Sequence, residues 1–122
     1  MTYSELATLL KTVGLPVAEP GDSGLALPAI AIQPDGMAPQ LGFPWLWEEA
    51  EIRVLYPLAS NNPAQFEACR AATAAVWVAL WGTQVQADED GPIYADTFTD
   101  PPSFGYTLNV RFPGNDLCTP TP

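Results

Sequence analysis

The chain has 122 residues, with fourteen acidic residues against four basic ones, no histidine, and a formal net charge of −10 at pH 7. Nucleic-acid backbones and anionic membranes are bound through clustered Lys and Arg, so this balance argues against a protein that grips either of them. The lack of histidine excludes Ser/His and Cys/His catalysis and His-bound metals within the chain. The length predicts one domain, spanning residues 1–114, followed by a flexible C-terminal tail at 115–122.

Targeting and membrane signals are weak. The N-terminal sequence MTYSELATLLKTVG has neither a basic start nor a continuous apolar stretch, so we expect no signal peptide. The longest apolar run, AATAAVWVALWG, is shorter than the roughly 20 residues that cross a bilayer. Cys69 lies in a helical pattern and Cys118 in a Pro/Thr-rich stretch, and we expect both thiols to be reduced. These features indicate a protein made and kept in a cytoplasm, away from membranes.

The first predicted element is a helix over about residues 3–13. Thr2 and Glu5 have the spacing of a capping box, in which each side chain satisfies a free amide of the first turn. Gly14 follows the last apolar position and is typical of a helix end. Residues 16–26 are rich in proline and glycine and are predicted to form a loop.

Two strands are predicted next. The apolar segment 27–34 is bounded by prolines, which favour an edge position, and a second loop is expected at 35–44. Residues 49–56 show the clearest alternation in the chain. The residues expected on the inward face are Ala50, Ile52, Val54 and Tyr56.

A long helix follows the second strand. Asn62 is a suitable N-cap, Pro63 suits the first helical position, and Gly82 marks the end. After Arg70 the helix has no charged residue, so we expect much of its circumference to be covered by other groups.

The remaining segments predict further strands at 83–87, 93–98 and 106–112, with the acidic segment 88–92 as a turn. Helix, strand, strand, helix and then strands is an order typical of an α+β fold. We therefore predict a small, mostly antiparallel sheet of about four or five strands, with two helices packed on one face.

Carboxylates are the only candidates for metal or acid–base chemistry. Asp88, Glu89 and Asp90 could bind calcium, but they are adjacent and lack the spaced pattern of a calcium loop. Glu49 and Glu51 lie on one strand face, and no partner base for them is identifiable. We predict no metal, no cofactor and no enzymatic activity.

Trp45 and Trp47 stand beside a Pro-Gly segment and are followed by three glutamates. They could cap the domain's own core, form a platform for sugars, anchor the protein to a membrane, or bind another protein chain. The neighbouring acids fit a membrane anchor poorly, whereas Trp is a favoured anchor of subunit contacts, with acids around it as a polar rim. Both the core and the interface interpretations remain open at this point.

The strand AEIRVLYP, the helix in SNNPAQFEACRAATAAVWVALWG and the closing strand YTLNVRF resemble the tail terminator proteins of long-tailed bacteriophages. The resemblance covers size and element order along nearly the whole chain. The segment DGMAPQLGFPWLWEE and the Pro-rich tail do not follow the family pattern, so no family role is carried over to them.

The resemblance implies a virion protein of the tail and neck, assembled in the host bacterial cytoplasm. It implies a homo-oligomeric ring, commonly a hexamer, that caps the tail-tube protein, ends tail polymerisation and presents a surface to the head-side connector, while DNA passes through without specific binding. The residues proposed on this basis for subunit or tail-tube contacts are Phe43, Trp45, Trp47, Glu48 and Trp81. The acidic residues proposed for the lumen are Asp88, Glu89 and Asp90.

Two alternatives remain. Another head–tail connector, neck or minor capsid protein would have similar size and physical properties. A monomeric glycan-binding module is a different class, and it would use exposed Trp rings to stack on sugars.

Overall fold

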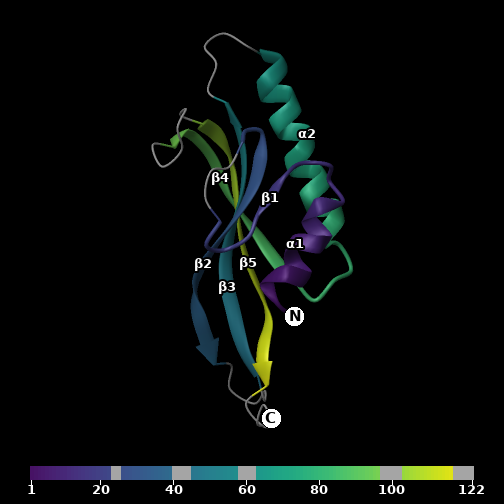
Figure 1. The fold of residues 1–122 in the computed structure, drawn as a ribbon, viewed down its shortest axis with the longest axis vertical. Helices are drawn as coiled ribbons and strands as arrows, with labels where there is room; N and C mark the ends of the chain where they lie inside the picture. Colours follow the sequence, from purple (N-terminus) through teal and green to yellow (C-terminus); the bar gives the residue numbers. More distant parts are fainter. Residues whose placement is uncertain (23–25, 40–44, 58–62, 97–102, 117–122) are drawn as a thin grey trace.

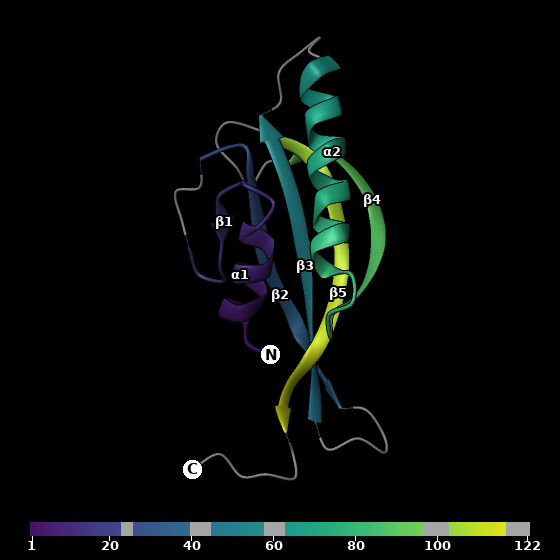
Figure 2. The same cartoon turned by 90° about the vertical axis from the view of Figure 1, so that its right-hand side faces the viewer.

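The computed structural model describes residues 1–22, 26–39, 45–57, 63–96 and 103–116 (Figure 1). Its elements are α1 (Tyr3–Lys11), β1 (Val17–Ala18), β2 (Ala29–Pro39), β3 (Trp45–Pro57), α2 (Pro63–Leu80), β4 (Gln86–Asp96) and β5 (Ser103–Asp116). The strands form one five-stranded sheet in the order β1-β2-β3-β5-β4. Among the described strands, β1 and β2 pair in parallel and the other neighbouring pairs are antiparallel. Both helices lie on the same face of this sheet, which confirms the predicted α+β fold (Figure 2).

Helix α1 begins as predicted. The Glu5 amide donates to the Thr2 hydroxyl at 3.1 Å, and the Thr2 amide donates to the Glu5 carboxylate at 3.2 Å. The helix ends at Lys11, two residues before the predicted end, because the amides of Thr12 and Val13 turn to carbonyls three residues back. The N-terminal amine donates to the Pro113 carbonyl at 2.9 Å, so the start of α1 is tied to β5.

Strand β2 extends through part of the predicted loop at 35–44. A register shift between Pro34 and Gly36 accommodates the proline, after which pairing with β3 resumes and continues to Pro39. Strand β1 pairs with Ile30 and Ala31 of β2 and does not reach Pro34. The missing backbone N–H of Pro34 therefore costs no hydrogen bond to β1. The loop prediction is therefore wrong for residues 35–39, while 40–44 lie outside the described residues.

Two further expectations are corrected. The acidic segment at 88–92 is not a turn: it belongs to β4, which absorbs Gly91 through register shifts against β5. Strand β1 arises within the predicted loop at 16–26, where the Ile30 amide donates to the Pro16 carbonyl at 2.8 Å. Strand β5 runs to Asp116 and so includes the first two residues of the predicted tail; residues 117–122 lie outside the described part of the chain, and the predicted division into domain and flexible tail stays a prediction.

The core lies between the helices and the inner face of the sheet. The predicted inward residues of β3 are buried there, and β5 contributes Leu108, Val110 and Phe112. From α2 the buried residues are Cys69, Ala72, Thr73, Val76 and Leu80. The sheet thus covers one side of α2, and none of the described residues covers the other side (Figure 2). No helix in the described part of the chain is long and apolar enough to cross a membrane.

Candidate interaction surfaces

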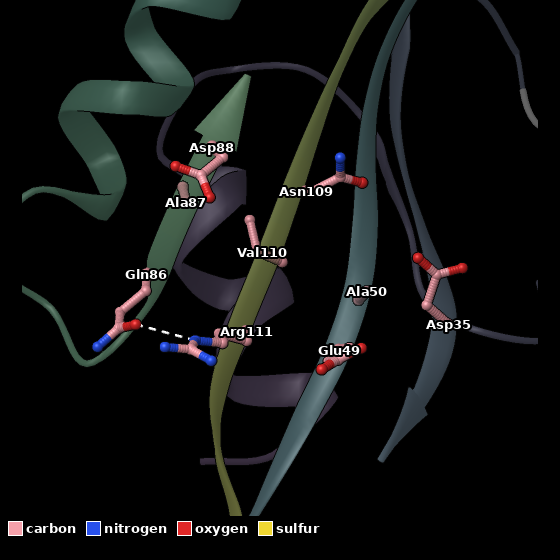
Figure 3. Close-up of a pocket in the computed structure, with 9 residues that line it drawn as sticks. All are labelled: Asp35, Glu49, Ala50, Gln86, Ala87, Asp88, Asn109, Val110 and Arg111. Carbon is pink, nitrogen blue, oxygen red and sulfur yellow. Dashed lines mark hydrogen bonds between the residues drawn. The ribbon is translucent and has the colours of Figure 1, made fainter. Parts of the chain in front are cut away.

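The open face of the sheet, opposite the helices, holds a shallow groove of about 650 Å³. Its polar lining comes from four strands: Asp35 on β2, Glu49 on β3, Gln86 and Asp88 on β4, and Asn109 and Arg111 on β5 (Figure 3). Strand register explains this gathering. Arg111 is paired with Glu49 on one side and with Gln86 on the other, so the three side chains share one face.

The groove is acidic, and its single arginine is engaged by neighbours. The Arg111 Nε donates to Gln86 Oε1 at 2.9 Å, and its guanidinium lies 4.8 Å from the centre of the Trp47 ring. This distance is within the range of a cation–π contact. Three carboxylates therefore dominate the charge of the groove lining. Within the described ranges no group of three or more His, Cys, Asp or Glu residues could hold a metal ion.

The tryptophans at the start of β3 belong to the sheet rather than to a loop. Trp45 is the first residue of β3, although its side chain and all of Phe43 lie outside what the structure describes. Trp47 is 7% exposed and packs beneath Arg111, so little of its ring is available to a partner. Glu48 is half-buried and accepts a hydrogen bond from the Tyr3 hydroxyl at 3.3 Å, which ties β3 to α1.

The uncovered side of α2 is an apolar surface that the sequence analysis did not locate. Val78 is 74% exposed and Trp81, just after the helix end, is 87% exposed. We call this side the α2 face; it comprises Ala64, Ala68, Ala71, Ala74, Val78 and Trp81, all exposed. One charged residue, the exposed Glu67, shares this side of the helix with Ala71, Ala74 and Val78. Its Oε1 lies 3.7 Å from Nη1 of Arg70, and both side chains are largely exposed.

A small pocket of about 180 Å³ adjoins the C-terminal end of the α2 face. It is lined by Trp77, Leu80, Trp81, Gly82, Thr83, Val85 and Ala87, none of which carries a charge. Val78 and this pocket were not among the predicted site residues. The sequence feature that pointed to this region was the uncharged stretch after Arg70. It indicated that much of the helix surface is covered by other groups, but it did not indicate which side stays exposed.

The acidic residues proposed for a lumen are in β4. Asp88 is exposed and lines the groove on the open face. Glu89 and Asp90 follow it in the same strand, and their side chains lie outside the described ones. The structure therefore brings Asp88 together with Asp35 and Glu49, which belong to strands far away in the sequence (Figure 3).

The Tyr3–Glu48 contact predicts a loss of stability in alkali. Burial and the Glu48 carboxylate raise the pKa of Tyr3 from 10.0 to about 12. The folded protein keeps this proton at a pH where the unfolded chain loses it. The stability is therefore fully present below pH 10 and falls as the pH rises toward about 12.

We expect Tyr3→Phe to flatten this fall, measured as the free energy of urea unfolding at several pH values. Burial also raises the pKa of Cys69 to about 11, so its contribution is lost over a lower window that begins near pH 9. Cys69→Ala is the matched control, since it should remove the lower window and leave the upper one. An unchanged upper slope in Tyr3→Phe would contradict the prediction.

No protein-family model matches the chain, and no curated protein matches its sequence.

Proposed function

We propose that this protein is a tail terminator of a long-tailed bacteriophage. In this role it forms a homo-oligomeric ring, commonly a hexamer, on the end of the tail tube. The observation that carries the proposal is the uncovered α2 face on a chain of net charge −10. A large exposed Trp beside an exposed Val on a helix of this length is typical of a surface buried in an assembly.

The opposite face of the molecule supports the same role. Its groove presents Asp35, Glu49 and Asp88 on the open face of the sheet. A wall of this charge repels phosphates, and DNA could pass it without being held. We propose that this face, with Glu89 and Asp90 nearby in β4, is turned toward the lumen of the ring.

In this role the partners are further copies of the chain, the tail-tube protein and the head-side connector. The protein would act in the neck of the virion after assembly in the bacterial cytoplasm, without catalysis or a cofactor. Another neck or minor capsid protein remains the second candidate, because it too would bury the α2 face. A glycan-binding module is less well supported at Trp47, since that ring is buried beneath Arg111, whereas the exposed Trp81 ring fits a sugar as well as a subunit contact.

The test is to add the purified protein to tail-tube subunits from the same virus as they polymerise. We expect electron microscopy to show a ring at one end of each tube and shorter tubes as more protein is added. Tubes that elongate unchanged and carry no added density would contradict the proposal. A ring that binds preformed heads but never tubes would instead favour the head-side neck protein.

A further inference from the structure

We draw no further inference here: the strongest candidate, the shallow groove on the open face of the sheet, belongs to the surface already described, and its carboxylates are exposed while no other feature of the described residues points to a ligand there.

Discussion

Gly105→Ala is expected to unfold the domain or leave it marginally stable. Gly105 is buried in β5, opposite Leu55 of β3. A Cβ at this position would overlap the Val54 carbonyl oxygen and lie 2.8 Å from the Val54 carbonyl carbon. Both obstructing atoms belong to the backbone of the central strand, so no side-chain movement can relieve the clash. Strands β3 and β5 would have to separate.

The expected cost is more than about 4 kcal/mol, a size reserved for substitutions that break a central structural feature. The free energy of unfolding of a typical domain is only about 5–15 kcal/mol in total. Urea unfolding followed by circular dichroism measures the change, and loss of all folded signal counts as the upper limit. Asn109→Ala is the matched control, because Asn109 is exposed on the same strand. A Gly105→Ala protein within about 1 kcal/mol of the original would show that β3 and β5 are not so closely apposed.

Trp47→Ala is expected to reduce the free energy of unfolding by about 3–5 kcal/mol, the usual cost of removing a buried aromatic side chain. The Trp47 side chain is almost wholly buried on the open face of the sheet, beneath the Arg111 guanidinium. Its removal leaves an unfilled space beneath Arg111 on the open face of the sheet and also ends the contact with the guanidinium. Trp47→Phe should recover part of the loss, since a smaller ring still fills part of the space.

Trp81→Ala is the matched control for this prediction. The same chemical change at a side chain that is 87% exposed should alter the stability of the monomer by less than about 0.5 kcal/mol. Urea unfolding of dilute protein measures both variants under the same conditions. Equal and small effects at the two positions would contradict the burial of Trp47. Equal and large effects would mean that Trp81 is covered within the single chain.

Trp47 and Trp81 differ in exposure in a way that the sequence did not predict. Trp47, next to a run of acids, could be core or interface from its sequence, and its burial assigns most of its ring to the chain's own packing. Trp81 was named as an interface residue beside it, and it is the one left exposed. Of the aromatic residues predicted for an interface, Trp81 is therefore the one that the structure shows to be exposed. Phe43 and the side chain of Trp45 lie outside the described part of the chain.

Helices were the most predictable part of the fold because their signals are local. The Thr2–Glu5 capping box, Pro63 at the first turn and Gly82 after the last one each act within a few residues. The inward face of β3 was predictable for the same reason, since alternation along one strand decides it. Each of these predictions needed no knowledge of distant segments.

Strand ends were less predictable because they depend on partners. Pro34 and Gly91 suggested loop and turn, yet both are tolerated in strands that have a free outer edge or an irregular register. The residue pairs that make the groove, such as Arg111 with Glu49 and with Gln86, come from strands that are remote in the sequence. A one-residue change of register would place them on opposite faces.

By itself the sequence determined the charge of this protein, the α+β order of its elements and the presence of a helix whose apolar surface exceeds what one neighbour can cover. Composition, caps and periodicity are properties of single segments, so they can be read without the fold. Only the tertiary structure decided that the sheet covers the side of α2 that carries Cys69, Val76 and Leu80, and that Trp81 is left exposed to solvent. It also decided that Asp35, Glu49 and Asp88 line one groove on the open face. Those outcomes follow from strand order and register, which are set by packing between residues far apart in the chain.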